Sequence, residues 1–142
     1  MLHPNEIGDR STLAIIFALS SQGYGIYIPF GENTRIDLIL ERGPSLRRVQ
    51  CKTGRYRDGA VEFATCSSYA HHPHPKIAKR DYVGEIDDFA VFCPDLGAVY
   101  LIPIEDLPTR TSATLRVGPP RNNQLNGVRF ARAYEIAKID LY

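Results

Sequence analysis

The chain has little of what a disulfide scaffold, a zinc module or a membrane protein needs. Its three cysteines, Cys51, Cys66 and Cys93, are odd in number and none belongs to a CxxC pair, which argues against a disulfide framework and against a zinc site. The apolar stretch at residues 13–19 is too short to cross a bilayer. Residues 1–10 contain two acids, unlike a targeting segment. We therefore expect a cytoplasmic protein with free thiols.

The size and composition are those of one globular domain. The chain has 142 residues, of which 44% are hydrophobic and 23% charged, and we expect residues 1–142 to form a single domain. The net charge of +1 conceals an uneven distribution. Bases predominate at residues 35–57 and 108–134, and acids at residues 85–106. We expect the two kinds of charge to lie on different faces, with the basic face suited to a polyanion. The alternative is a set of solvated loops whose arginines pair locally.

One helix is predicted at the start of the domain. Residues 5–22 have helical spacing, with Asn5 as a possible N-cap and Gly23 as the stop. Four residues of this segment share one helical face: Leu13, Ile16, Phe17 and Ser20.

Strands are predicted in six apolar segments, at residues 24–30, 36–41, 46–53, 60–66, 89–93 and 99–104. Turn sequences at residues 42–45 and 94–97 predict two hairpins. Residues 67–80 contain two prolines and three histidines and are predicted as a surface loop. Residues 128–134 fit either a short helix or a final strand. The fold class expected is α/β or α+β, with a mixed central sheet flanked by helices.

The most informative feature is Asp37 in one predicted strand, followed by Gln50-Cys51-Lys52 in the next. Residues two apart in a strand point to the same face, so Gln50 and Lys52 project together while Val49 and Cys51 project into packing. The hairpin brings Asp37 alongside them.

This arrangement resembles the PD-(D/E)XK nuclease superfamily, in which a carboxylate on one strand and a (D/E)xK triplet on the next form a divalent-metal site. Ile36-Asp37 stands in for PD, and Gln50-Cys51-Lys52 for the triplet. Glu6 is placed like a glutamate that members often add from the first helix. Several wider segments look like the group I intron-associated branch of this superfamily, which lies near the Holliday junction resolvases. These segments are NEIGD, PFGENTRIDLI, VQCKTG, CSSYAHH, and GPPRNNQ with GVRFA. The resemblance implies a restriction-endonuclease-like fold.

The resemblance also implies the site chemistry. Mg²⁺, with Mn²⁺ as a substitute, would be bound by Asp37, Glu6, Gln50 and the backbone carbonyl of Cys51. Lys52 would orient the attacking water and offset charge on the phosphate. Gln50 departs from the usual acidic residue, and a neutral amide oxygen should hold a metal more weakly than a carboxylate.

These residues also have purely structural explanations. Asp37 can be a sheet-edge charge paired with Arg35 or Arg48, and Lys52 a solvated lysine at a strand end. Glu6 suits the first turn of any helix because of the helix dipole.

The residues expected to contact DNA are bases, histidines and amides of the basic and irregular segments: Arg35, Arg47, Arg48, Arg55, Arg57, His71, His72, Lys76, Lys79, Arg80, Arg121, Asn122 and Asn123. A zinc site at the histidines is disfavoured, because a proline interrupts them and no partner Cys or Asp lies nearby.

The function expected is therefore a Mg²⁺-dependent DNA endonuclease. The lack of a separate DNA-reading module favours a structure-selective Holliday junction resolvase. The alternatives are a site-specific homing endonuclease, which the intron-associated resemblance supports, and a noncatalytic DNA-binding domain, which Gln50 suggests. Cutting both strands generally requires two active sites, so a homodimer or higher homo-oligomer is expected.

Overall fold

The computed structural model describes residues 2–31, 34–70, 77–107, 111–120 and 125–139. No helix in these ranges is both long and apolar enough to cross a membrane. The elements follow one another in the order α1 (Pro4–Ser21), β1 (Gly25–Tyr27), β2 (Leu38–Arg42), β3 (Ser45–Thr53), β4 (Arg55–Arg57), β5 (Ala60–Ala64), β6 (Cys66–Ala70), β7 (Ile77–Asp81), β8 (Asp88–Cys93), β9 (Ala98–Pro103), η1 (Ile104–Asp106), β10 (Ser112–Arg116), η3 (Ala131–Ala133) and β11 (Glu135–Lys138).

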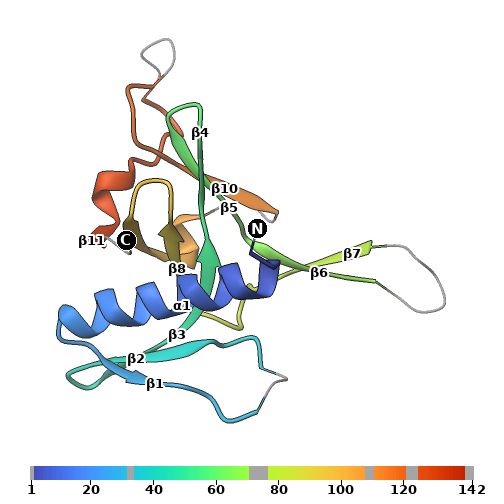
Figure 1. Ribbon diagram of the computed structural model, residues 1–142, viewed down its shortest axis with the longest axis vertical. Coiled ribbons are helices and arrows are strands. Elements are labelled where there is room, and N and C mark those ends of the chain that lie inside the picture. The colour runs from blue at the N-terminus through green and yellow to red at the C-terminus, as the bar shows by residue number, and fades with distance from the viewer. Residues whose placement is uncertain (1, 32–33, 71–76, 108–110, 121–124, 140–142) are drawn as a thin grey trace.

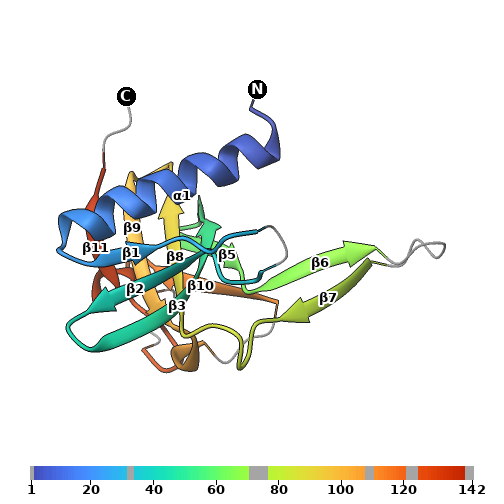
Figure 2. The same ribbon diagram turned by 90° about the horizontal axis from the view of Figure 1, so that it is seen from below.

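A six-stranded mixed sheet forms the centre of the molecule, in the order β1-β2-β3-β8-β9-β11 (Figure 1). Strands β3 and β8 are parallel, and the other neighbours in this sheet are antiparallel. Figure 2 shows α1 lying over one face of the sheet. A three-stranded sheet, β10-β5-β4, packs on the opposite side, and the hairpin β6-β7 projects from the body in both views. The predicted mixed α and β fold is therefore confirmed.

The start of α1 differs from the prediction. The N-cap is His3, whose Nδ1 accepts a hydrogen bond from the backbone N–H of Asn5, and not Asn5 itself. Pro4 occupies the first helical position, where its missing N–H costs nothing and its fixed φ suits a helix. The predicted end is confirmed, because the helix stops before Gly23, which has a φ of 90°.

The helical face that Leu13, Phe17 and Ser20 share is not the face of α1 that packs on the sheet. Leu13 and Phe17 point to solvent, with 66% and 64% of their surface exposed. The buried face consists mainly of small residues together with two larger aliphatic ones: Ser11, Ala14, Ile15, Ala18 and Leu19. Small side chains let the helix axis approach the sheet closely, which the hydrophobic pattern alone does not reveal.

Both predicted hairpins of the central sheet are confirmed. Strands β2 and β3 pair from Leu38 with Val49 to Arg42 with Ser45, and Gly43 opens the two-residue turn with a φ of 58°. Strands β8 and β9 are joined by residues 94–97, as predicted. The predicted strand at residues 24–30 is shorter than expected and forms only β1.

Other predicted segments need correction. Residues 67–70 and 77–80, predicted within a surface loop, lie in β6 and β7, which pair from Cys66 with Asp81 to Ala70 with Ile77. The rest of that predicted loop, residues 71–76, lies outside the described residues. The strand predicted at residues 60–66 divides into β5 and the start of β6. In the C-terminal segment, residues 128–134 contain the 3₁₀ turn η3, and the final strand is β11, which begins one residue later. Neither β4 nor β10 was predicted, because three-residue and edge segments give weak patterns.

Gly54 joins β3 to β4 and sits against the core between the two sheets. A Cβ at this position would lie 2.7 Å from Cγ1 of Val61 and 2.9 Å from Cγ1 of Val91. Both valines are fully buried, so neither can move aside freely. We expect Gly54→Ala to lower the free energy of unfolding by about 1–3 kcal/mol.

The matched control is Gly8→Ala in α1, where an added Cβ would meet nothing within 4 Å. Alanine is the better helix former, so this variant should be equally or more stable than the unmodified protein. Urea unfolding of both variants measures the difference. Equal stability of the two would contradict the tight packing at Gly54.

Candidate active site

Asp37 lies immediately before β2, at the point where the β2–β3 ladder ends. Its N–H donates to the carbonyl of Val49 at 2.8 Å, and its Oδ2 accepts a hydrogen bond from the N–H of Cys51 at 2.9 Å. The Asp37 carboxylate therefore accepts the hydrogen bond that a backbone carbonyl would accept from Cys51 if the β2–β3 ladder continued. This geometry holds Asp37 against the centre of the Gln50-Cys51-Lys52 segment, as the sequence predicted.

Strand β3 places its residues alternately on the two faces of the sheet. Val49 is fully buried beneath α1 and Cys51 packs beside it in the same cluster. Gln50 and Lys52 point to the opposite face. Nε2 of Gln50 donates to the carbonyl of Arg35 at 2.5 Å, which turns the amide oxygen away from that carbonyl. The predicted register is thus observed.

Lys52 is held by two hydrogen bonds. Its Nζ donates to the carbonyl of Cys66 and to the hydroxyl of Tyr82, each at 3.3 Å, and lies 5.0 Å from the Tyr82 ring centroid. An ammonium group has three N–H donors, so one remains for a substrate. Lys52 is therefore not the solvated strand-end lysine of the structural alternative.

Tyr82 was missed by the sequence analysis. It is 4% exposed and packs edge-on against Phe89 with ring centroids 5.6 Å apart. The guanidinium of Arg35 covers its ring at 3.8 Å. No motif spacing relates Tyr82 to Lys52, which lies thirty residues earlier, so only the folded structure reveals that this tyrosine fixes the lysine.

The surroundings of Asp37 disfavour an uncompensated negative charge. Burial raises the pKa of its carboxyl above the usual value, while the hydrogen bond from Cys51 and the charge of Lys52 partly oppose that rise. Burial and the neighbouring Asp37 also raise the pKa of the Cys51 thiol. The sulfur therefore stays protonated at neutral pH and is a poor metal ligand.

The backbone carbonyl of Cys51 is better placed. In a strand the N–H and C=O of one residue point to the same side, and the N–H of Cys51 faces the Asp37 carboxylate. Its carbonyl thus points past the end of β2, beside Asp37. Together with the amide oxygen of Gln50, these groups form a set of oxygen donors that suits a hard divalent cation.

This donor set contains a single carboxylate. Among the residues that the structure describes, no group of three or more His, Cys, Asp or Glu side chains gathers into a metal-binding cluster. The residues present therefore fit a cation held weakly, with water completing its coordination.

The Glu6 side chain is used at the helix terminus. Its Oε2 accepts a hydrogen bond from the N–H of His3 at 2.9 Å, which completes a capping box. This contact gives Glu6 a structural role as a capping residue, in addition to the favourable helix dipole that the sequence suggested. A role in binding a metal would require the side chain to leave the cap.

A family of known proteins matches nearly the whole chain. The sequence model of the PD-(D/E)XK endonuclease family matches residues 2–137. The chain belongs to this family. The order of Asp37 before β2, followed by Gln50 and Lys52 on β3, agrees with the motif after which the family is named, except that Gln50 replaces an acidic residue.

A solved structure supports the fold of this endonuclease family member. The bacterial homing endonuclease I-Ssp6803I matches with a TM-score of 0.76 and 18% sequence identity, over 94% of this chain and 89% of that chain. No curated protein matches the sequence.

Among the described residues, Arg47 and Arg48 lie beside the acids of residues 85–106 and not on a separate face, contrary to the prediction. Arg47 pairs with Asp88 at 2.7 Å through two of its nitrogens, and Arg48 pairs with Asp87 at 3.1 Å. The cause is the parallel pairing of β3 with β8, which aligns the basic start of one strand with the acidic start of the other. The side-chain hydrogen bond from Arg48 also holds the pKa of Asp87 below its usual value.

Arg35 is likewise engaged within the fold. Its guanidinium donates to Glu85 at 2.9 Å and to Ser67 at 2.8 Å, and its side chain is only 18% exposed. The ion-pair alternative for Asp37 fails, because both arginines suggested for it pair with other acids. The acids at residues 85, 87 and 88 are thus all paired with arginines.

The remaining residues expected to contact DNA fall into two groups. Arg55, Arg57 and Lys79 are exposed, and Arg80 is paired with Glu85. The others lie outside the residues that the structure describes: His71, His72, Lys76, Arg121, Asn122 and Asn123.

Proposed function

We propose that the protein is a metal-dependent DNA endonuclease that hydrolyses phosphodiester bonds, with Mg²⁺ as the metal and Mn²⁺ as its substitute. The observation that carries this proposal is the Asp37 carboxylate, which is partly buried, has a raised pKa and accepts a hydrogen bond from the N–H of Cys51 beside Lys52. A bound cation would restore the stabilisation that this carboxylate loses on burial.

The residues have distinct parts in the reaction. Asp37, Gln50 and the carbonyl of Cys51 would hold the cation, which would supply Lewis-acid stabilisation of the phosphate. Lys52 directs its remaining N–H toward the attacking water or a phosphate oxygen. Tyr82 keeps the ammonium group in that position through its hydroxyl. Glu6 joins the site only if it leaves the N-cap of α1.

Two DNA substrates are candidates, and each has its own support. A four-way junction is favoured because the described residues form no separate DNA-reading module such as a helix-turn-helix. A duplex target is favoured because the structurally similar I-Ssp6803I is a homing endonuclease of nearly the same length. The compactness of the chain therefore does not by itself select junctions.

The test incubates purified protein with a four-way junction and with linear duplexes of the same sequences and of random sequence. Each substrate is assayed with Mg²⁺, with Mn²⁺, with Ca²⁺ and with EDTA. We expect cleavage with Mg²⁺ and Mn²⁺, and binding without cleavage with Ca²⁺. Cutting of the junction alone supports a resolvase. Full activity in EDTA would overturn the metal mechanism, and binding without cutting under every condition would support the noncatalytic alternative.

Gln50 provides a direct test of the ligand set. Gln50→Glu adds a second carboxylate, so we expect a lower Mg²⁺ concentration for half-maximal cleavage, and Gln50→Ala should raise it. Titrations of the cleavage rate with Mg²⁺ compare both variants with the unmodified protein. Three superimposable curves would remove Gln50 from the metal site.

The protein acts as a homo-oligomer in this proposal. Cleavage of both strands of a symmetric target needs two active sites, which a two-fold dimer supplies. All three cysteines are free, in keeping with action in a reducing cytoplasm. Sedimentation with and without DNA measures the oligomeric state.

A further inference from the structure

The arginines of this protein differ in how their charges are compensated. Arg35, Arg47 and Arg48, which the sequence suggested for DNA binding, pair with carboxylates. Arg116 and Arg129 are held by backbone carbonyls instead. Within the described ranges, no ion pair joins either of them to an acid. Their positive charge therefore remains available.

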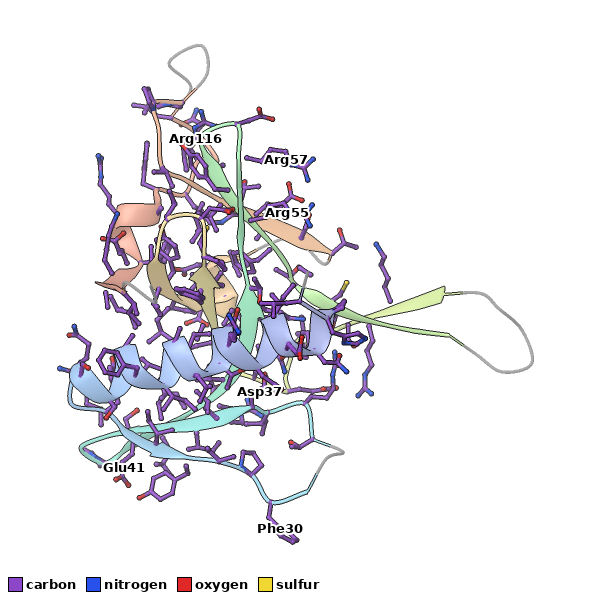
Figure 3. All side chains as sticks on the ribbon, in the orientation of Figure 1. Phe30, Asp37, Glu41, Arg55, Arg57 and Arg116 are labelled. Carbon is purple, nitrogen blue, oxygen red and sulfur yellow. The ribbon has the colours of Figure 1, made fainter. Side chains whose placement is uncertain are left out.

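The two strands that flank β5 bring these charges together on the outer face of the three-stranded sheet. Arg57 on β4 and Arg116 on β10 both stand opposite Ala60, one on each side of it. Val61 and Leu115, next along their strands, point into the core, so the arginines point outward. The small side chain of Ala60 leaves room between them. Figure 3 shows Arg57 and Arg116 near each other at the same end of the molecule.

A hollow of about 320 Å³ occupies this position. Arg57, Arg116 and Arg129 line it, together with Asp58, Glu62 and Thr114. The backbone brings Arg129 close, because the N–H of Arg116 donates to the carbonyl of Arg129 at 2.6 Å. The hollow is therefore built from three segments that are distant in the sequence.

The arginines outnumber the acids at the hollow. Glu62 stands directly opposite Arg55 across the β4–β5 pair, where opposite charges offset each other. Two carboxylates, Asp58 and Glu62, and three guanidinium groups therefore line this hollow among the residues that the structure describes. An excess of positive charge with spare N–H donors suits a phosphate group.

Arg116 is fixed before any ligand arrives. Its Nη1 donates to the carbonyl of Asp58 at 2.9 Å, and its Nε and Nη2 donate to the carbonyl of Pro119 at 3.2 and 3.0 Å. A guanidinium has five N–H donors, so two remain after these three contacts. A preorganised donor loses little side-chain entropy when it binds.

We propose that this hollow binds a phosphate of the DNA backbone beside the cleavage site, through Arg57, Arg116 and Arg129. The inference rests on the proposed DNA endonuclease function and adds a DNA-binding surface to it. Strand β4 follows β3 directly, so Arg57 lies at most about 17 Å along the chain from Lys52, at about 3.3 Å per residue. That length corresponds to about five nucleotides of duplex, at about 3.4 Å each. This length joins the two backbone positions only; with the reach of the Arg57 and Lys52 side chains added, the phosphate bound lies within about one helical turn of the scissile bond.

The test measures duplex affinity in Ca²⁺ as a function of salt, for the unmodified protein and for Arg57→Ala and Arg129→Ala. Each lost phosphate contact should lower the slope of log K against log salt by about 0.9, and lower affinity on the order of tenfold at 0.1 M salt. With Mg²⁺ the same variants should show a raised KM and an unchanged kcat. Melting temperatures confirm that the fold is intact.

The matched control is Arg42→Ala, at the β2–β3 turn, where Arg42 is exposed and donates to the hydroxyl of Tyr24. If Arg42→Ala weakens binding as much as the two variants do, the effect is general charge loss and the proposal is overturned. The phosphate-binding proposal is also overturned if Arg57→Ala and Arg129→Ala bind DNA as tightly as the unmodified protein does. In that case the proposed endonuclease function still stands, provided that the unmodified protein binds and cuts DNA. If the unmodified protein binds no DNA, both fail.

Inorganic phosphate is the competing source of the same chemistry. Phosphate should raise the melting temperature of the unmodified protein only weakly, because a single free anion lacks the additional contacts of a duplex. A strong rise that Arg57→Ala abolishes, combined with unchanged DNA affinity, would assign the hollow to a free phosphate and overturn the DNA proposal.

Discussion

Asp37→Asn abolishes DNA cleavage and leaves the protein folded: this is the largest effect we expect from a single substitution. The change keeps the acceptor for the N–H of Cys51 but removes the one carboxylate among the proposed donors Asp37, Gln50 and the Cys51 carbonyl. Affinity for DNA should be retained or increased, because a negative charge beside the phosphates is lost. Cleavage and binding assays at saturating Mg²⁺ measure the two effects separately.

The pKa of Asp37 predicts the accompanying change in stability. Burial raises the pKa of Asp37 in the folded state above its value in the unfolded chain, which is about 4. Protonation of Asp37 therefore stabilises the folded state, and this stabilisation is complete below about pH 4. It is lost as the pH rises through the pKa of the folded state. At neutral pH the buried carboxylate therefore costs stability. Without metal, Asp37→Asn should melt at the same or a higher temperature at pH 7.5, and the difference should vanish below about pH 4.

Mg²⁺ supplies the control for this interpretation. A ligand that binds only the folded state raises the melting temperature, so Mg²⁺ should stabilise the unmodified protein more than Asp37→Asn. Retained cleavage by Asp37→Asn, or an equal response of both proteins to Mg²⁺, would place the metal elsewhere.

Lys52→Met should reduce the cleavage rate by about 10²-fold or more, with a small change in KM. Methionine keeps the unbranched aliphatic stem but removes the ammonium group that we place near the attacking water. Single-turnover cleavage at saturating DNA and Mg²⁺ measures the effect on the chemical step.

Tyr82→Phe separates a catalytic role of Lys52 from a structural one. Lys52→Met and Tyr82→Phe both remove the hydrogen bond between Nζ of Lys52 and the Tyr82 hydroxyl. Only Tyr82→Phe keeps the ammonium group and its hydrogen bond to the Cys66 carbonyl. A catalytic lysine should make Lys52→Met far slower than Tyr82→Phe. Equal losses of rate, matched by equal losses of melting temperature, would show that the lysine only ties β3 to its neighbours.

The local pattern of the sequence was sufficient to predict that Asp37 lies beside the Gln50-Cys51-Lys52 segment. Alternation in residues 46–53 fixed which side chains of β3 face the helix, because a shift of one residue would have buried Lys52 and exposed Val49. The turn at Gly43-Pro44 placed β2 against β3, and Asp37 beside Cys51 followed from that register. The association of Asp37, Gln50 and Lys52 with metal chemistry came from the family resemblance.

Contacts between distant segments were decided only by the tertiary structure. The parallel pairing of β3 with β8 turned Arg47 and Arg48 from expected DNA contacts into partners of Asp88 and Asp87. Close packing of α1 on the sheet selected its small residues for burial and left Phe17 exposed. Sequence periodicity records which residues share a face, but not which face meets the core when two are plausible.

The same distinction explains the residues that the sequence did not suggest. Tyr82 reaches Lys52, and Arg116 meets Arg57 across Ala60, through chain segments separated by tens of residues. Local propensity carries no information about such pairings, because they depend on which strands become neighbours in a sheet. The sequence by itself thus determined the motif and its register, whereas the folded chain determined which side chains support the lysine and which arginines stay free to bind a phosphate.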